Sequence, residues 1–338
     1  MFLQAAINLT NIQEYKNVYE DVFVDTKTGA VLDSTLCPIY ETLYEVLFWW
    51  GGTLHGQNLV DKNLRKIALE KRYQGLLEEL ATITTEDIEI AKVLDDTKQT
   101  VYAMHSHGWY PYGHLHDSLL RLYPWRNEKF ENPIVLCSKY NRVVDFPLHL
   151  KAFGYEENTI YRTSEKYRLI KVAKLHYGVN ESPFWTTSSQ EQYGWMREGY
   201  LNLLDEEIKK LPEINGLYLS RNHVGRRGVT NNDEVELFLK GKGFRTLTGN
   251  EKLIEIISLF YRAKTIVGPH GSIFVNTIFC KEKAKIIEFC PNNRQDFSFK
   301  GKTKLAQDYN HILVPADEDF NIEININELK FLLDGKVK

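Results

Sequence analysis

From Thr100 onward, short apolar segments alternate with segments of helical periodicity, and this alternation constrains the fold more than any other feature of the sequence. The predicted strands lie at residues 100–104, 133–138, 159–163, 169–175, 216–221, 244–248, 265–271, 285–289 and 311–315. The predicted helices lie at residues 114–122, 145–153, with Asp145 as N-cap, 194–210, 232–240, 251–263 and 272–279. Strands that alternate with helices indicate a parallel sheet with helical crossovers, so an α/β fold is predicted.

The alternation is interrupted near residues 205–215 and then starts again. We therefore predict two doubly wound, Rossmann-like domains that face a cleft, an N-terminal one of residues 1–210 and a C-terminal one of residues 211–338. The length of 338 residues agrees with about two domains. Residues 1–95 form an extension with little pattern beyond predicted helices at 41–50 and 64–80.

The composition excludes several classes of protein. Lys and Arg number 42 against 45 Asp and Glu, a balance that argues against a dedicated nucleic-acid binder. The four cysteines form no CxxC pair, so neither a disulfide framework nor a cysteine zinc site is expected. The N-terminus lacks a basic segment before an apolar run, and no window approaches the ~18 apolar residues of a membrane span. We expect a cytoplasmic protein; no pattern indicates its oligomeric state.

Open parallel sheets bind ligands beyond the carboxyl ends of their strands, so the residues that follow each strand are the candidate site. Ser220 and Arg221 end the predicted strand at 216–221, and Arg226 and Arg227 follow in the same loop, here called the arginine loop (residues 220–228). Arginine side chains bind phosphate oxygens through two parallel hydrogen bonds. The alternative is a solvated basic loop without a ligand.

A second candidate is the glycine turn (residues 268–272), which joins a predicted strand to a predicted helix. Its residues are Gly268, Pro269, His270, Gly271 and Ser272, and Asn276 follows one turn later. Such a turn presents backbone N–H groups and a helix N-terminus to an anion, here a diphosphate. It matches neither the dinucleotide-binding fingerprint nor the P-loop. The alternative is a tight turn with a satisfied histidine.

Glu288 lies at the end of the next predicted strand. A carboxylate there can accept hydrogen bonds from a ribose diol, although it can equally be a surface glutamate. Taken together, the arginine loop, the glycine turn and Glu288 predict a pocket for a nucleoside diphosphate.

These elements occur in an order that resembles glycosyltransferase family 61, also known as DUF563. The segments that carry the resemblance are LYLSR (217–221), Arg226-Arg227, Asn231, Tyr261-Arg262-Ala263, IVGPHGS (266–272), Asn276, KIIEF (285–289) and Pro291. The family includes plant xylosyl- and arabinosyltransferases, the EGF-domain-specific O-GlcNAc transferase and bacterial capsule-type enzymes. One departure is Ile273, which stands where the family commonly has a third glycine.

The resemblance covers roughly residues 95–315 and is strongest at 216–291. It implies a GT-B-like fold and a UDP-sugar donor held mainly by the C-terminal domain. It also implies a glycan hydroxyl as acceptor and inversion at the anomeric carbon. UDP-xylose and UDP-N-acetylglucosamine lie within the range of the family.

Four of the ten histidines fall between residues 105 and 116, and Asp117 follows directly. The family has an H-x-x-[HCL]-D motif here; His116 and Asp117 fit it, whereas its leading histidine aligns with Gly113 rather than with His114. Inverting transfer needs a base for the acceptor hydroxyl. Asp117 is the leading candidate, His116 is the reserve and His114 a further candidate, while Asp117 can equally cap its helix or orient His114.

Two other functions are compatible with these residues. The run His114-Leu115-His116-Asp117 is similar to the H-x-H-x-D-H of metallo-β-lactamase-type metal sites, although the aspartate comes one place early; further ligands would be His149, His176 or His223. The second alternative is an inactive, glycan-binding relative. No D-x-D motif follows a strand in the predicted cleft regions, so transfer without metal or cofactor is expected. The acceptor is expected to be bordered by Trp109, Tyr110, Tyr112 and the segment 184–195; the alternative is aromatic packing between the domains.

Overall fold

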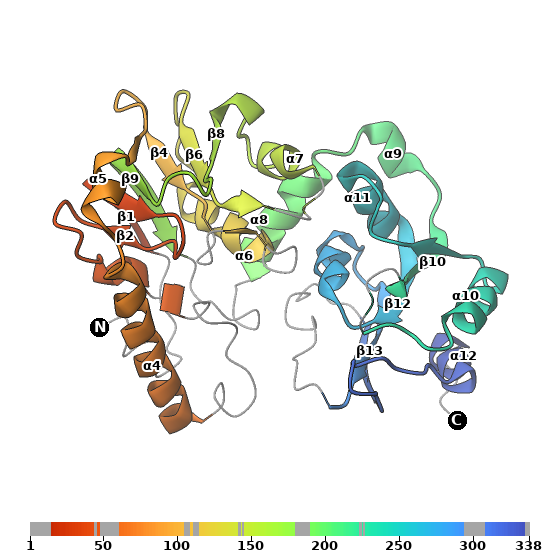
Figure 1. Ribbon diagram of the computed structural model, residues 1–338. Coiled ribbons are helices and arrows are strands. Elements are labelled where there is room, and N and C mark those ends of the chain that lie inside the picture. The colour runs from red at the N-terminus through yellow and green to blue at the C-terminus, as the bar shows by residue number, and fades with distance from the viewer. Residues whose placement is uncertain are drawn as a thin grey trace. The chain divides into compact units, whose positions relative to one another are not determined.

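The computed structural model describes residues 15–43, 46–47, 61–104, 109–110, 115–140, 143, 145–179, 190–222, 225, 227–293 and 308–334. The chain divides into two compact units, residues 1–192 and 193–338, and each is built around its own sheet (Figure 1). The division falls inside the helix α8 (Gln190–Leu201). The sequence-based division after residue 210 lies one helix later, because the predicted helix at 194–210 is two helices, α8 and α9 (Glu206–Lys210).

The main sheet of unit 1 contains β1 (Tyr15–Asp25), β2 (Val31–Leu32), β3 (Lys92–Val93), β4 (Thr100–Tyr102), β6 (Ile134–Cys137), β8 (Ile160–Arg162) and β9 (Leu169–Val179). Their order is β2-β1-β9-β4-β6-β8, and β3 pairs with β9. The neighbours β9, β4, β6 and β8 are parallel, as predicted. A separate parallel pair is formed by β5 (Trp109–Tyr110) and β7 (Lys139–Tyr140).

The parallel sheet predicted for unit 1 is present, but the strand β1 adds to it in the antiparallel direction. This strand pairs antiparallel with β9 along its whole length, from Tyr15 opposite Val179 to Asp25 opposite Leu169. It was missed because half of its residues are polar or charged and its partner strand lies far away in the sequence. The sheet is therefore mixed, with an antiparallel addition on a parallel core.

The helices of unit 1 are α4 (Lys62–Leu80), α5 (Thr85–Glu89), α6 (Leu115–Leu119) and α7 (Phe146–Lys151), with 3-10 segments η1 (Tyr40–Thr42), η3 (Leu120–Trp125) and η4 (Glu157–Thr159). Leu69 and Leu76 of α4 are buried in one core with β1 and β9. The predicted helix at 114–122 becomes a 3-10 helix from Leu120 onward, where Pro124 removes one backbone donor. Asp145 precedes α7 but has left-handed backbone angles and makes no capping hydrogen bond, so the predicted capping role is wrong.

A buried arginine ties η3 to the sheet. Arg121 is 1% exposed, and its guanidinium lies 4.9 Å from the ring centroid of Tyr102 and 5.5 Å from that of Tyr177. Its Nη1 donates a hydrogen bond of 3.0 Å to the Tyr177 hydroxyl. Two aromatic faces and a hydroxyl thus help to compensate the buried charge.

Unit 2 holds a five-stranded parallel sheet in the order β11-β10-β12-β13-β14. The strands are β10 (Ile214–Leu219), β11 (Phe244–Leu247), β12 (Ala263–Pro269), β13 (Lys285–Pro291) and β14 (Asp308–Val314). The other elements are α10 (Asn232–Gly241), α11 (Leu253–Arg262), η6 (Ser272–Phe279) and α12 (Ile326–Asp334). All five strands were predicted, whereas α12 was not.

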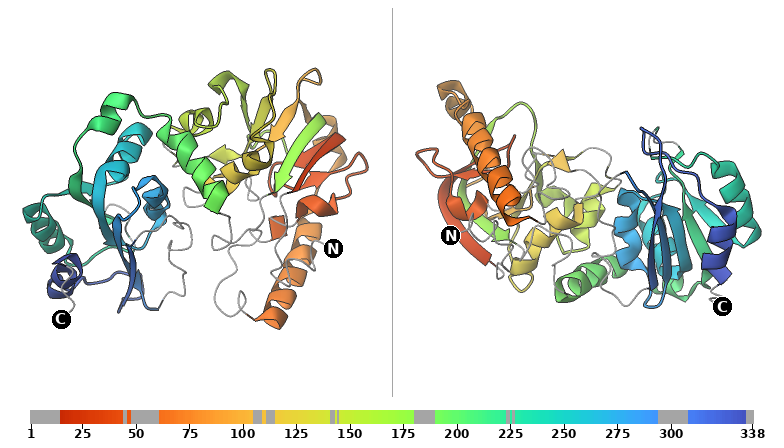
Figure 2. Two further views of the ribbon diagram at one scale, coloured as in Figure 1. Left: turned by 180° about the vertical axis from the view of Figure 1, so that it is seen from behind. Right: turned by 90° about the horizontal axis from the view of Figure 1, so that it is seen from below.

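Helices cover both faces of the sheet of unit 2 (Figure 2). Val235 of α10 and Leu329 of α12 join one core with Tyr218 and Ile287 on one face. The helix α11 packs against η6 on the opposite face. This double winding is the architecture of an α/β domain with a Rossmann-like sheet, as predicted.

In both sheets the strand order reverses beside the first strand of the parallel set. In unit 1 the chain runs outward from β4 through β6 to β8, and then returns to place β9 on the other side of β4. In unit 2 it runs from β10 to β11 and then places β12 on the other side of β10. Such reversals are where open α/β sheets bind ligands. The segment 105–117, which holds four histidines and Asp117, follows β4 in the sequence. The arginine loop follows β10, and the glycine turn follows β12.

Candidate functional site

The carboxyl ends of β10 and β12 approach each other unusually closely in unit 2. A side chain at Gly268 would place its Cβ 2.8 Å from Cβ of Leu219 and 3.0 Å from the Leu219 carbonyl oxygen. Such distances are too short for a real side chain, so glycine is needed where the two strands lie this close. The residues that follow, Ser220 and His270, are buried, at 7% and 3% exposure.

The arginine loop and the glycine turn meet at Arg221 and Gly271. A Cβ at Gly271 would lie 2.0 Å from Nη1 of Arg221 and 2.9 Å from its Cζ. The backbone of Gly271 is extended, with φ of 178°, so the residue is glycine because of space and not because of torsion. The Arg221 guanidinium, 6% exposed, therefore rests on the backbone of the turn. A permanent positive charge beside a glycine turn that joins a strand to a helix fits the chemistry of an anion site.

His270 is held by Glu288 of the adjacent strand. The Nδ1 atom of His270 lies 2.7 Å from Oε1 of Glu288, and the backbone N–H of His270 donates to the carbonyl of Phe289 at 2.7 Å. The other carboxylate oxygen, Oε2, accepts from the Tyr309 hydroxyl at 2.8 Å and lies 3.2 Å from Nδ1 of His311. The parallel register of β13 and β14, with Glu288 opposite His311, brings these groups together.

The charge state of this network follows from its contacts. Burial is the largest single influence on the Glu288 carboxyl and by itself would raise its pKa. The hydrogen bonds from His270, His311 and Tyr309 together outweigh it, so the pKa of Glu288 lies below its ordinary value of 4.5. The pKa of Tyr309 is well above 10.0, because of burial first and of the Glu288 charge second. Glu288 is therefore an ionised acceptor, and Nδ1 of His270 carries the proton toward it.

The structure gives Glu288 a different role from the predicted one, which was to accept hydrogen bonds from a ribose diol. Its side chain is 0% exposed, and both oxygens already face protein donors. A ribose diol would need an oxygen open to the ligand, so the ribose-acceptor role does not fit. The geometry assigns Glu288 to orienting His270 beside the glycine turn. The sequence could not indicate this, because the register between β13 and β14, which brings Tyr309 and His311 to Glu288, is not contained in a local pattern.

The remaining predicted residues of unit 2 take different positions. Ser272 begins η6 and is half-buried, and Asn276 is buried one turn later. The helix that begins at Ser272, η6, is a 3-10 helix. Arg227 is half-buried with a left-handed φ of 55°, and its backbone N–H donates to Asp319 at 3.2 Å. Arg226 lies outside the described residues.

A C-terminal segment that the sequence did not single out anchors the arginine loop. The side-chain amide of Asn231 donates to the carbonyl of Ile324 at 2.9 Å, and its Oδ1 accepts from the Ile324 backbone at 3.0 Å. Gly228 and Thr230 bond to the same segment, through Asn321 and Ile322. Asn231 thus has a structural role, which the motif alone did not reveal.

The candidate base lies in unit 1, on α6. His116 is buried at 2% exposure on this helix. The backbone of Asp117 belongs to α6, but its side chain lies outside the described part, as do His114, Tyr112, the segment 180–189 and the side chains of Trp109 and Tyr110. The base assignment therefore stays a prediction, as does the acceptor border.

The zinc hypothesis required ligands from His149, His176 or His223. His149 is buried on α7. His176 is on β9, and its ring packs between those of Trp125 and Phe130. Among the residues that the structure describes, no group of three His, Cys, Asp or Glu side chains is arranged to hold a metal ion. His105, His107, His114 and His223 lie outside that part of the chain.

A family model bears on the choice between these functions. The model named Glycosyltransferase 61 matches residues 112–287, more than half of the 338 residues. The chain belongs to glycosyltransferase family 61. Comparison with curated proteins gives no match. The matched part of this glycosyltransferase includes His116, Asp117, the arginine loop and the glycine turn, and ends within β13.

Membership in glycosyltransferase family 61 confirms the resemblance drawn from the motifs and makes the protein a glycosyltransferase with a donor and an acceptor substrate. It favours this activity over the zinc-dependent hydrolase. The antiparallel strand β1 and the helix α4 precede the matched residues. Within the described residues, no helix is both long enough and apolar enough to cross a membrane.

Proposed function

We propose that this glycosyltransferase moves a sugar, xylose or N-acetylglucosamine, from a UDP-sugar to a glycan hydroxyl, with inversion of the anomeric centre and without a metal ion. The observation that carries the proposal is the Arg221 guanidinium on the backbone of Gly271, at the strand reversal of unit 2. This is where a nucleotide binds in an open parallel sheet. The family membership supplies the reaction class.

The diphosphate is assigned to the arginine loop and the glycine turn. Arg221, with Arg226 and Arg227, supplies fixed positive charge, and the turn supplies backbone N–H groups. Departure of UDP leaves negative charge on the diphosphate, and pre-positioned donors stabilise that charge in the transition state. Because these groups provide the electrostatic work, the proposed mechanism routes no step through a metal ion.

His270 is assigned to the donor as well, with Glu288 as its positioning residue. The ionised Glu288 fixes the ring orientation of His270 through Nδ1, at 2.7 Å. A ring held in this way does not have to be ordered when the donor binds, and pre-organisation favours affinity and rate. Ser272 and Asn276 complete the proposed donor contacts.

The acceptor hydroxyl must lose its proton as its oxygen attacks the anomeric carbon, and the bond from that carbon to the diphosphate oxygen breaks. We assign the role of the base that accepts this proton to Asp117. His116 is the reserve candidate and His114 a further one. A positioned base contributes roughly 10²–10⁴-fold to the rate.

The experiment that tests the donor assignment compares nucleotides by thermal shift and by calorimetry. UDP should raise the melting temperature, by the equivalent of about 2.7 kcal/mol at a concentration of 100 Kd. GDP and CMP should do much less. Arg226→Ala should weaken the binding of UDP but not of uridine, because the proposal assigns this arginine to the diphosphate. Stronger stabilisation by GDP or CMP would contradict the donor assignment, and UDP binding without transfer to any glycan would favour the inactive relative.

A further inference from the structure

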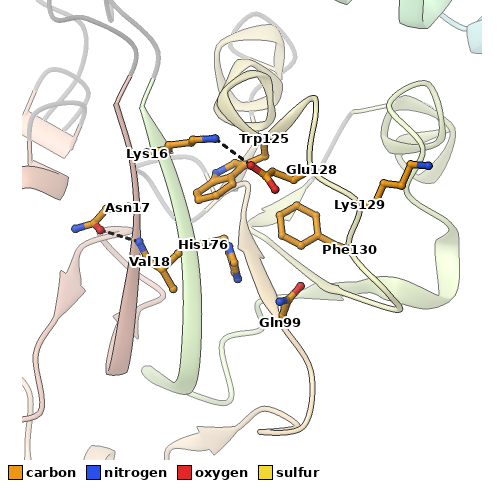
Figure 3. Close-up of a pocket in the computed structure, with 9 residues that line it drawn as sticks. All are labelled: Lys16, Asn17, Val18, Gln99, Trp125, Glu128, Lys129, Phe130 and His176. Carbon is orange, nitrogen blue, oxygen red and sulfur yellow. Dashed lines mark hydrogen bonds and ion pairs between the residues drawn. The ribbon is translucent and has the colours of Figure 1, made fainter.

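A pocket of about 420 Å³ opens in unit 1, and none of the residues that line it is assigned to transfer (Figure 3). It is lined by Lys16, Asn17, Val18, Gln99, Trp125, Glu128, Lys129, Phe130 and His176. Gln99 immediately precedes β4, and Phe130 lies in the segment that leads into β6. The pocket therefore sits toward the amino ends of these strands, whereas the candidate base follows the carboxyl end of β4. Its volume is within the ~300–1,000 Å³ of small-molecule sites.

His176 is the unusual residue of this pocket. It is 6% exposed, and within the described part of the chain neither of its ring nitrogens has a hydrogen-bond partner. Its ring contacts Trp125 edge-on at 5.0 Å between centroids and Phe130 at 4.9 Å. Buried polar groups without partners destabilise a fold, so they are few and call for an explanation. A ligand that hydrogen-bonds to the imidazole supplies one.

The charges around the pocket are balanced. Nζ of Lys16 pairs with Oε1 of Glu128 at 3.1 Å, above the Trp125 ring. Figure 3 shows the Lys129 side chain directed away from the space that the other residues surround. Burial and the nearby Lys174 lower the pKa of His176, against the opposing effect of Glu128. A pocket with a paired lysine and a neutral histidine has no excess charge for an anion such as phosphate.

The hydrogen-bonding groups of the pocket are of mixed type. A neutral imidazole offers one donor and one acceptor, and the amide of Gln99 offers both as well. Hydroxyl groups are the ligand groups that donate and accept at once. The walls between these polar groups are the rings of Trp125 and Phe130, against which C–H groups pack. A ligand with alternating hydroxyl groups and C–H faces matches both features.

We propose that this pocket binds a short, neutral saccharide, with hydroxyl groups on His176 and Gln99 and a sugar face on the aromatic rings. The site is separate from the donor site of unit 2 and does not depend on the assignment of UDP-sugar as donor. It would hold a glycan on this chain independently of transfer.

The test is saturation-transfer difference NMR on the full chain in the presence of excess UDP. The probes are xylobiose, N,N′-diacetylchitobiose and maltose, with inorganic phosphate as the anionic comparison. At least one saccharide should bind to the wild type. His176→Phe keeps a ring between Trp125 and Phe130 but removes both nitrogens, and should weaken that binding about tenfold or more. Gln99→Ala should weaken it as well, and Lys129→Ala is the matched control without effect.

Thermal melting shows whether each variant is folded, and Gln99→Ala keeps the test valid should His176→Phe not fold. Arg221→Ala, which changes only unit 2, should bind the saccharide as the wild type does. The proposal is overturned if no saccharide binds to the wild type. It is also overturned if folded His176→Phe and Gln99→Ala bind as the wild type does, or if phosphate is the probe that these variants lose.

Discussion

Nδ1 of His270 lies 2.7 Å from Oε1 of Glu288, and both side chains are buried. The pair joins the glycine turn to the centre of β13. Because the second oxygen of Glu288 is engaged by β14, the turn is connected through one carboxylate to two neighbouring strands. The geometry of the turn therefore depends on a residue that does not itself face the ligand.

Glu288→Gln should change stability in a pH-dependent way. The pKa of Glu288 is lowered on folding, so its ionised form stabilises the fold above the ordinary value of 4.5, and this contribution is lost as the pH falls through the folded-state pKa. The variant should lose about 1–3 kcal/mol of unfolding free energy near neutral pH, because a neutral amide replaces a charged acceptor. Urea unfolding at several pH values measures both effects.

The wild type and Glu288→Gln should therefore converge in stability as the pH falls below 4.5. UDP affinity, measured at neutral pH, should fall as well, because His270 loses its orientation. A variant that kept wild-type UDP affinity while losing stability would restrict Glu288 to a structural role.

Gly271→Ala should weaken UDP binding by displacing Arg221. The new Cβ would lie 2.0 Å from Nη1 of Arg221, a distance that forces the buried guanidinium to move. The loss of UDP binding free energy should approach that of Arg221→Ala. For Arg221→Ala we expect a loss of roughly 1.5–3 kcal/mol, the contribution of a charge-assisted hydrogen bond. Gly241→Ala is the matched control, since a Cβ there meets nothing within 4 Å. Calorimetric titration with UDP measures all three variants.

The double variant Arg221→Ala/Gly271→Ala distinguishes displacement from a general distortion of the turn. If Gly271→Ala acts through Arg221, the double variant should bind UDP no more weakly than Arg221→Ala alone, since the two changes remove the same interaction. Additive losses would contradict this coupling.

His176 should make the stability of unit 1 sensitive to mild acid. The pKa of His176 is lowered from 6.5 on folding, by burial first and by Lys174 second. The fold therefore favours the neutral ring, and the resulting stabilisation is complete only above pH 6.5. As the pH falls below 6.5, the unfolded chain takes up the proton first and stability decreases until the folded-state pKa is passed. His176→Phe should flatten this decrease, as measured by chemical unfolding between neutral and mildly acidic pH. An unchanged slope would show that other groups control it.

The sequence predicted the strands of unit 2 almost completely, because a buried parallel strand is a short continuous apolar run and each of these runs ends at a glycine or polar turn. It also placed Arg221 and Gly271 at the carboxyl ends of two predicted strands. The contact between them could not be predicted, because it depends on which strands are neighbours: β12 lies beside β10 only after the chain reverses.

Other features depend on long-range pairing that local patterns do not contain. β1 is rich in polar residues, and its partner β9 lies at the far end of unit 1, so neither its strand nor its direction follows from its own sequence. The inward orientation of Glu288 depends on the register between β13 and β14, which places Tyr309 and His311 in contact with its carboxylate. The pocket around His176 combines β1, η3 and β9, three elements that become neighbours only in the folded sheet.

Asp117→Asn tests the base of the transfer reaction. The substitution preserves the shape of the side chain but removes its capacity to accept a proton, so transfer should fall by roughly 10²–10⁴-fold. UDP affinity should stay near that of the wild type, because the proposed donor contacts are all in unit 2. Rates with the matching UDP-sugar and acceptor, together with UDP titrations, measure the two effects separately. His116→Ala is the companion variant: if it abolishes transfer while Asp117→Asn stays active, the histidine is the base, and if both stay active, the assignment of the base to α6 is wrong.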